Sequence, residues 1–480
     1  MGCHTPRGLC YNVITMPPRF FRTEVLIVCA VFFVTGGARP SPYKQSTGAP
    51  RAASVETHPG TLLVFPFEND SRVASLDWLG EGLSEATVER LQDRGLNSLS
   101  RQERLAALEK IGLPDSARFS RATMVKIATE ADADEVVFGR FTSDGKTVTL
   151  EARVLRIMPP SLSQPYTQSG PLESLLRLHA RLSWQILCAL AQKNCLPPGA
   201  NTDESSFAHP PPSLRPDALQ NFVRGIITSD DEVRLRALRE AARLEPAWDR
   251  PVFELGQLYF ARRNCEAALP WFSRVPPNRP DGPEAGFNTG VCHLLLNDAV
   301  RAEAAFSGLM ERTRGADPNN RLPEMSEVRN NLGVARLRAG KPTEAAAEFE
   351  WAAAIDEEEP DYWINLGIAK LAAKQPAAAV PPFERARKLD PADKGVRTLL
   401  ISTLQSLGRT ADARAILAES AENSPPAAPT ASQDPAALAR LARVSMKFDR
   451  ALLRPGGDPS AAQPSRGVDS QKREGDGGRR

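Results

Sequence analysis

The chain has 480 residues, enough for about three domains. Charged residues make up 25% of it and the formal net charge is +2, so the composition gives no sign of binding to nucleic acid or to acidic substrates. Many of the 41 prolines lie in three stretches, 40–59, 197–216 and 425–464, which we interpret as linkers between folded parts.

The N-terminal segment has the pattern of a secretory signal. Residues 25–35 form an unbroken apolar run, preceded by Arg19 and Arg22 and followed by the small residues 36–38. Such a run is short for a membrane span and typical of a signal-peptide core. We therefore assign residues 1–38 to a signal peptide, with an uncleaved signal anchor as the alternative.

This assignment predicts an exported protein, periplasmic or associated with the cell envelope. Its mature chain would start near Arg39 and continue through a linker at 39–59. Met1 and Met16 both fit as start codons, and Met16 gives the more compact basic lead. The membrane would be contacted only through the N-terminal segment, and only if that segment is not cleaved.

Residues 60–195 alternate between strand and helix patterns. Short strands are expected at 61–67 and 97–101, and a hairpin is expected at 135–155 with Asp144-Gly145 as its tight turn. Apolar residues at helical spacing predict three helices, at 79–94, 120–131 and 172–190. The alternation predicts an α/β domain large enough for its own core.

Four phrases of this domain occur in an order typical of a known family. They are VFPF at 64–67, LGEGLSE at 79–85, SR at 100–101 and ADADEVVFG at 131–139. Together they resemble the TolB-like family, related to FlgO and to the curli-secretion lipoprotein CsgG, although Glu135 replaces the family's aromatic residue. The resemblance implies a binding or assembly role at the cell envelope, without catalysis, in a domain that precedes helical repeats.

Residues 196–215 form a proline-rich linker after this domain. The consecutive prolines at 210–212 favour extended backbone rather than a helix or strand. We therefore predict that the α/β domain and the following part fold separately, and that limited proteolysis cuts this linker first.

The C-terminal half repeats with a period of 34 residues. Glycine, alanine and phenylalanine recur at this step, with one interval longer by 9 in each series. The members are Gly256, Gly290, Gly333 and Gly367; Ala268, Ala302, Ala345, Ala379 and Ala413; and Phe272, Phe306, Phe349 and Phe383. This period indicates a solenoid of paired helices, in which small residues let two helices approach and the aromatic ring fills the space between pairs.

The segment 361–391 shows the pattern most fully. It carries Trp363, Leu366-Gly367, Ala379 and Phe383 and ends in Asp-Pro, which resembles the tetratricopeptide repeat closely, with Lys370 in place of the usual Tyr. The resemblance implies an all-α solenoid over 216–427, so the whole chain is expected to be multidomain, with the α/β domain followed by this array. About six repeats are expected, at 216–248, 249–282, 283–316, 326–359, 360–393 and 394–427.

In such a solenoid the first helix of each pair lines a concave groove. The resemblance places ten apolar residues there: Phe253, Phe260, Phe287, Val291, Leu294, Val334, Leu337, Ile364, Ile368 and Leu371. The Lys and Asn positions of the family's carboxylate clamp are not filled, so we predict a groove that binds an apolar helix or an extended peptide of a partner protein. The alternative is that several of these side chains pack between helices.

The sequence offers little that points to catalysis. The five histidines are scattered, which argues against a zinc site. The glycines at 80 and 82 lack the rest of a phosphate-binding loop, and Ser84 and Glu85 fit the start of a helix. The acidic run 356–359 fits a solvated turn. We therefore predict no enzymatic activity and no cofactor or metal.

Four cysteines lie beyond the signal: Cys188, Cys195, Cys265 and Cys292. An exported chain could form two disulfides, but buried single thiols explain the same positions. Cys188 and Cys195 would be too far apart to pair if both were helical.

The C-terminus is expected to hold one more helix, at 434–453, with Asp434 as its N-cap. It would either cap the end of the array or fold back and occupy the groove as an internal competitor, and capping is the favoured option. Residues 454–480 have almost no apolar side chains and are predicted to be disordered.

Together these features predict a non-enzymatic scaffold of the bacterial cell envelope whose repeat groove binds a protein or peptide. The alternative is a small-ligand sensor or a secretion-complex subunit that acts through the TolB-like domain. The partner and the oligomeric state are left open by the sequence.

Overall fold

The computed structural model describes residues 60–71, 73–115, 118–190, 214–315, 325–421 and 434–450. The expected signal at 1–38, the linker at 39–59, nearly all of the linker at 196–215 and the tail at 454–480 lie outside these ranges. The described residues belong to one compact unit, Thr57–Arg480. Within them, no helix is both long enough and apolar enough to cross a membrane.

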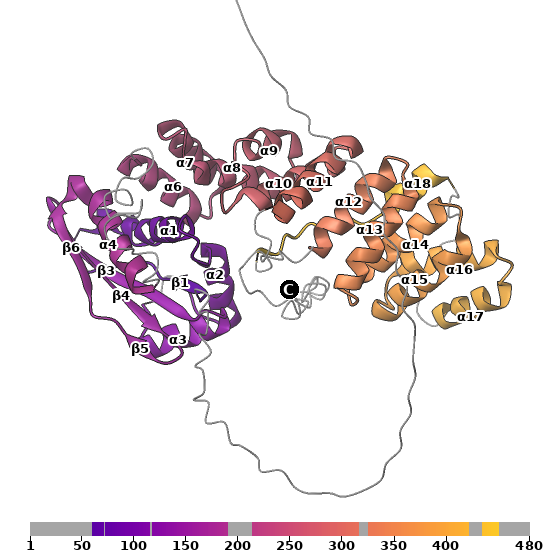
Figure 1. Ribbon diagram of the computed structural model, residues 1–480, viewed down its shortest axis with the longest axis horizontal. Coiled ribbons are helices and arrows are strands. Elements are labelled where there is room, and N and C mark those ends of the chain that lie inside the picture. The colour runs from indigo at the N-terminus through magenta and orange to yellow at the C-terminus, as the bar shows by residue number, and fades with distance from the viewer. Residues whose placement is uncertain are drawn as a thin grey trace, which may run out of the picture. The chain divides into compact units, whose positions relative to one another are not determined.

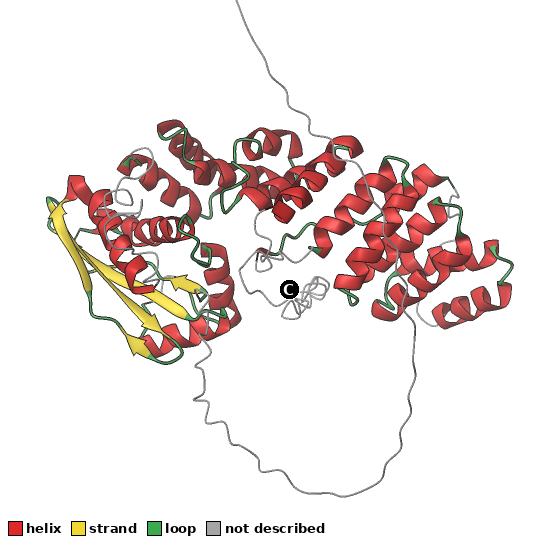
Figure 2. Ribbon diagram, in the orientation of Figure 1, coloured by secondary structure: helices red, strands yellow, loops and turns green. Residues whose placement is uncertain are grey.

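The first folded part, residues 60–190, is a mixed sheet with helices, here called the sheet region (Figure 2). The central strand β3 pairs with β1 and β2 in parallel and with β4 in antiparallel, and β4 also pairs with β5 and β6 in antiparallel. The strands are β1 Leu62–Val64, β2 Glu68–Asn69, β3 Glu135–Ser143, β4 Thr147–Arg156, β5 Ser161–Leu162 and β6 Tyr166–Pro171.

Helices cover both faces of this sheet. Successive residues of a strand point to opposite faces, so each face has its own core. Leu62 and Val64 share one core with α1 Trp78–Gln92 and α4 Leu175–Leu190. Leu63 and Phe65 share the other core with α2 Arg101–Lys110 and α3 Arg121–Glu130. Two short 3-10 turns, Ala74–Leu76 and Leu172–Ser174, lead into α1 and α4.

The expected strand at 97–101 is wrong: only Ser98 pairs, through a single bridge to Leu62. Helix α2 begins instead at Arg101, and Ser100 caps it. The Ser100 hydroxyl accepts from Glu103 N, and the Glu103 carboxylate accepts from Ser100 N at 2.7 Å. This capping box is favourable enough to start a helix where the apolar pattern suggested a strand.

The second folded part, residues 216–421, is an array of helix pairs, here called the repeat array (Figure 1). Sequential helices contact each other throughout the array, as in a solenoid. The pairs are α6 Pro216–Ile227 with α7 Asp231–Leu244, α8 Asp249–Ala261 with α9 Cys265–Phe272, α10 Gly282–Leu295 with α11 Ala299–Gly315, α12 Ser326–Arg338 with α13 Pro342–Ile355, α14 Pro360–Ala372 with α15 Pro376–Leu389, and α16 Lys394–Ser406 with α17 Thr410–Ala421.

The 34-residue period has a steric cause. A β-carbon on Gly256, Gly290, Gly333 or Gly367 would lie 2.4–2.6 Å from a phenylalanine ring of the second helix in the same pair. Those rings belong to Phe272, Phe306, Phe349 and Phe383, which are almost completely buried. The glycine leaves the space that the ring fills, so the two residue types have to recur together.

The C-terminal segment differs from its prediction. A helix at 434–453 was expected, but α18 spans only Pro435–Leu441, with Asp434 as its N-cap, and the chain has no regular secondary structure from Ala442 to Asp449. Helix α18 contacts α14 and α12 rather than the end of the array, so it does not cap the array. The following residues enter the groove, where polar side chains of the array replace the hydrogen bonds that a helix would have made.

Cys265 and Cys292 are buried free thiols, which agrees with the interpretation of single buried cysteines for these two. Burial raises the pKa of the Cys292 thiol, so it is protonated and unreactive. Cys188 is disulfide-bonded.

Candidate peptide-binding groove

The first helices of four consecutive pairs, α8, α10, α12 and α14, together with the start of α16, contact residues 442–450, here called the tail segment. These helices form the surface that we call the groove. It already holds an extended piece of the chain, and the contacts of that piece define what the groove can bind.

Two asparagine side chains form hydrogen bonds with the backbone of the tail segment. The Asn365 amide accepts from Arg443 N at 2.7 Å and donates to Arg443 O at 2.8 Å. The Asn331 amide accepts from Ser445 N at 2.8 Å and donates to Ser445 O at 2.9 Å. Each asparagine therefore pairs with one residue as a neighbouring β-strand would, and the two residues so held are two positions apart, as extended backbone requires.

A third asparagine joins the two. Asn330 accepts from the Asn365 amide at 2.7 Å and donates to Arg443 O at 3.1 Å and to the Ser445 hydroxyl at 3.0 Å. Asn330, Asn331 and Asn365 are fully buried. Because a buried amide without partners is costly, these three side chains favour an occupied groove.

Arg443 lies between two carboxylates. Its guanidinium donates through Nη1 to Asp361 at 2.5 Å and through Nη2 to Asp393, the N-cap residue of α16. Burial alone would raise the pKa of Asp393, but the hydrogen bond from Arg443 outweighs it and holds that pKa below its usual value. Both partners are therefore ionised, and the contact is a charge-assisted hydrogen bond.

The middle of the tail segment is apolar on the side that faces the array. The Phe448 ring packs on the Phe287 ring, with centroids 5.2 Å apart. Val444, Met446 and Phe448 are partly buried against the core of the array, whereas Lys447 is exposed. Arg443 and Ser445 contact the array too, so most of the segment lies against its surface.

Arg450 lies between a second pair of carboxylates. It donates through Nη2 to Asp281 at 2.9 Å and through Nε to Glu284, and its guanidinium stacks over Phe253 at 5.2 Å from the ring centroid. Burial would raise the pKa of Asp281, but Arg250 and Arg450 together hold it below its usual value.

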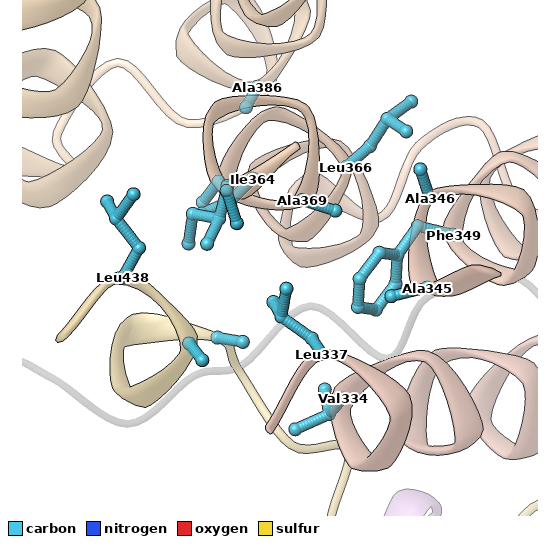
Figure 3. Close-up of a cluster of buried hydrophobic side chains, with 14 of the residues drawn as sticks. Val334, Leu337, Ala345, Ala346, Phe349, Ile364, Leu366, Ala369, Ala386 and Leu438 are labelled. Carbon is cyan, nitrogen blue, oxygen red and sulfur yellow. The ribbon is translucent and has the colours of Figure 1, made fainter. Parts of the chain in front are cut away.

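The ten predicted groove residues are mostly buried in the array. Of these, Phe253 and Phe287 contact Arg450 and Phe448 of the tail segment directly. In Figure 3 the side chains of Leu438, Ile364 and Leu337 converge from α18, α14 and α12. The other members with almost no exposure are Val291, Leu294, Val334 and Ile368; Phe260 and Leu371 are partly buried. Their part in binding a partner stays a prediction.

The asparagines were missed by a search for apolar groove positions, although the sequence contains a signal for them. Asn331 and Asn365 are 34 residues apart and each stands two residues before the repeat glycine. Asn288 holds the same position before Gly290 and donates to Gln257 at 2.9 Å. A polar residue that recurs at a fixed step and is buried has a binding or packing role, because its hydrogen bonds must be satisfied.

Among the described residues, no group of three His, Cys, Asp or Glu side chains is placed to hold a metal ion. A small pocket of about 210 Å³ adjoins Arg450 and is lined mainly by charged side chains, including Glu85, Arg250 and Glu254. Its walls belong to the same charge network as the tail contact.

Two models of the tetratricopeptide repeat match this chain, one at residues 253–321 and 330–394 and the other at residues 370–433. These residues therefore carry tetratricopeptide repeats, and repeats of this class are interaction modules rather than enzymes. The fold is thus a mostly helical repeat solenoid preceded by a small α/β region with a sheet, and it supports a role as a protein-interaction scaffold.

Solved structures similar to part of this chain include three proteins. The MamA protein is 15% identical, with 36% of this chain and 92% of that chain covered and a TM-score of 0.32. YrrB, described as a TPR protein with an unusual peptide-binding site, is 14% identical, with 39% and 92% covered and a TM-score of 0.33. PilW, described as a type IV pilus biogenesis factor, is 20% identical, with 43% and 90% covered and a TM-score of 0.34. No curated protein matches the chain.

Proposed function

We propose that this protein is a non-enzymatic scaffold whose groove binds an extended peptide segment of a partner protein. The observation that carries the proposal is the pairing of Asn331 and Asn365 with the backbone of the tail segment. Side-chain amides that pair with backbone N–H and C=O groups recognise the backbone of an extended peptide, whichever protein supplies that peptide.

The groove also meets the physical requirements of a peptide site. It offers hydrogen bonds to the backbone, an aromatic surface at Phe287 and carboxylates at both ends of the tail segment. Backbone pairing supplies affinity and the side-chain contacts supply selectivity, which is the division of roles expected for extended-peptide recognition.

A labelled synthetic peptide with the sequence of residues 442–450 tests this proposal. The full-length chain with Arg443→Ala and Arg450→Ala, which weakens its own tail contact, should bind the peptide saturably in a fluorescence-anisotropy titration. Adding Asn331→Ala and Asn365→Ala to this chain should abolish binding. A peptide that does not bind, or that binds equally to the chain without both asparagines, would refute the proposal.

We also propose that the protein acts at the bacterial cell envelope, exported by its N-terminal segment, and that the sheet region is a TolB-like domain of a multidomain chain. The basic lead and the short apolar run at 25–35 support export. The phrase order in residues 64–139 supports the TolB-like assignment. In this proposal the sheet region binds an envelope component and the groove holds the second protein.

A small-ligand sensor or a secretion-complex subunit acting through the sheet region is the alternative. Three pockets that border this region have volumes of about 210, 240 and 290 Å³. Small-molecule sites usually have volumes of about 300–1,000 Å³, so these pockets are small for a sensor. We therefore favour the scaffold.

A further inference from the structure

We infer that the groove selects a partner segment with the pattern Arg-x-Ser-x-x-aromatic-x-Arg, and that the tail segment is a resident occupant which this partner has to displace. The pattern is that of Arg443 to Arg450. The inference rests on the proposed function and adds the chemistry of the partner and the competition with the chain's own tail.

Both ends of the segment are specific for arginine. Asp361 and Asp393 bind different nitrogens of Arg443, and Asp281 and Glu284 bind different nitrogens of Arg450. A planar guanidinium presents several N–H groups in fixed directions and can bridge two carboxylates, whereas an ammonium is a single point charge. The Phe253 ring beneath Arg450 adds a stacking surface that also favours a guanidinium.

The spacing between the two arginines is fixed by the backbone contacts. Asn365 and Asn331 hold residues 443 and 445 in extended register, and Phe287 receives the ring of Phe448. When Ser445 is paired with Asn331, Arg443 lies beside its two carboxylates. The contact of Phe448 with Phe287 then positions Arg450 beside the second pair of carboxylates. An insertion between Ser445 and Phe448 would move Arg450 away from Asp281 and Glu284.

The groove is acidic without its occupant. Among the described residues, Arg443 is the ion-pair partner of both Asp361 and Asp393. Burial raises the pKa of Glu327 and of Glu359, two further carboxyls beside the tail segment, and their neighbours Asp449 and Asp361 add to this shift. Removing the tail would leave Asp361 and Asp393 without this cation, so the groove favours a cationic segment in its place.

The test compares four labelled peptides on the full-length chain with Arg443→Ala and Arg450→Ala. They are the sequence of residues 442–450, the same with both arginines replaced by lysine, the same with both replaced by alanine, and the same with one glycine inserted after the serine. The lysine and insertion peptides should bind at least about tenfold more weakly, and the alanine peptide about a hundredfold more weakly, because charge-assisted contacts are lost.

The unaltered chain should bind the first peptide more weakly than the Arg443→Ala, Arg450→Ala chain does, because its own tail competes. A matched control replaces the exposed Arg440 and Lys447 by alanine, which removes the same charge without touching the acidic pairs, and should bind like the unaltered chain. Each chain's molar mass is measured by light scattering, since occupancy by the tail of a second copy would make the unaltered chain a dimer and the double-alanine chain a monomer.

The outcomes separate the two proposals. If all four peptides bind alike, the selection for arginine is wrong while peptide binding stands. If the first peptide binds the unaltered and double-alanine chains equally, or if the mass shows a tail-exchanged dimer, the resident occupant is wrong. If no peptide binds any chain, the proposed function itself fails.

Discussion

Arg250 of α8 donates a hydrogen bond to Glu85 of α1 at 2.6 Å, and the two side chains are only 14% and 3% exposed. This salt bridge joins the repeat array to the sheet region across 165 residues of sequence. Two further contacts join the same two parts at α1 and its C-cap. Trp248 donates to Glu89 at 3.2 Å, and Arg279 donates to Asp93 at 2.5 Å. The sequence predicts that the sheet region and the repeat array fold separately, whereas these contacts would couple their unfolding.

Removing the cation of this bridge should destabilise the whole chain. Arg250→Met leaves Glu85 buried without this cation, while Asp281 keeps Arg450, and a stranded buried charge typically costs about 3–5 kcal/mol. Urea unfolding followed by circular dichroism measures the loss. Adding Glu85→Gln should recover part of it, because the stranded charge is removed.

The matched control is Arg243→Met, which breaks the exposed pair with Glu240 and should leave the unfolding midpoint unchanged. If Arg250→Met is also without effect, or if the sheet region and the repeat array unfold in separate steps in the unaltered chain, the junction does not couple them.

Glu89 gives the junction a defined pH dependence. Burial raises the pKa of Glu89 from 4.5 to about 7, with Arg250 opposing the shift and Asp249 and Asp93 adding to it. Between these values the folded state keeps a proton that the unfolded state has lost, so this group lowers stability as pH rises through that window. Glu89→Gln should remove this fall, at most about 1.4 kcal/mol per pH unit.

The measurement is the free energy of unfolding of parent and variant from about pH 4 to about pH 8. His179 acts in the opposite direction, since burial lowers its pKa to about 3 and its protonation on unfolding costs stability below about pH 6.5. It is present in both chains, so the difference between them isolates Glu89. A difference that does not change with pH would contradict the shifted pKa.

Gly367→Ala should destabilise the repeat array. The new β-carbon would lie 2.4 Å from the Phe383 ring, so the ring or the helix has to move. Overpacking of this kind costs about 1–3 kcal/mol, which outweighs the higher helix propensity of alanine, about 1 kcal/mol. Thermal unfolding measures the effect, and adding Phe383→Leu should restore part of the stability. Unchanged stability in Gly367→Ala would show that the ring can shift freely.

Asn365→Asp should loosen the tail segment. The carboxylate cannot donate to Arg443 O, so this carbonyl keeps only the longer bond from Asn330 and faces a negative charge, at a cost of about 1–3 kcal/mol. Trypsin should then cut after Arg443 or Lys447 about ten times faster or more, as followed by mass spectrometry. Asn221→Asp is the control, because Asn221 also donates to a backbone carbonyl, that of Asp217, but lies on α6. Equal cutting rates in both variants would contradict the contact.

Export predicts a mature N-terminus near Arg39. Chemical sequencing of the protein isolated from the envelope fraction of cells that express the full chain measures it. A first residue at Met1 or Met16 in a cytosolic fraction would refute export, and the same first residues in a membrane fraction would support the uncleaved anchor.

The helix pairs could be predicted from sequence because their cause is local. Each repeat glycine contacts a phenylalanine of the same pair, so the period of the sequence is the period of the packing. Helix α3 begins after Ser120, as its capping pattern indicates, and the hairpin turns at Asp144-Gly145. Such signals lie within a few residues of the structure that they determine.

The sequence offered occupation of the groove only as the less favoured option for the C-terminal segment. The contacts of the tail segment and of the junction could not be predicted in this way, because their partners are distant in sequence. Residues 434–453 have an apolar and basic pattern that fits a helix, whereas the amides of Asn331 and Asn365 make the extended form favourable at 443–445. The acidic residues Glu85, Glu89 and Asp93 recur every fourth position along one face of α1 and at its C-cap, which on its own fits a solvated helix surface.

The covalent link between the tail segment and the array sets the concentration that a partner needs in order to displace the tail. A ligand tethered to its own receptor commonly acts at a millimolar effective concentration. A free segment that makes the same contacts would therefore have to approach that concentration, while one that also binds elsewhere on the protein, or arrives in several linked copies, would exchange at far lower levels. The groove would in this way respond to assembled or locally concentrated partners rather than to isolated ones.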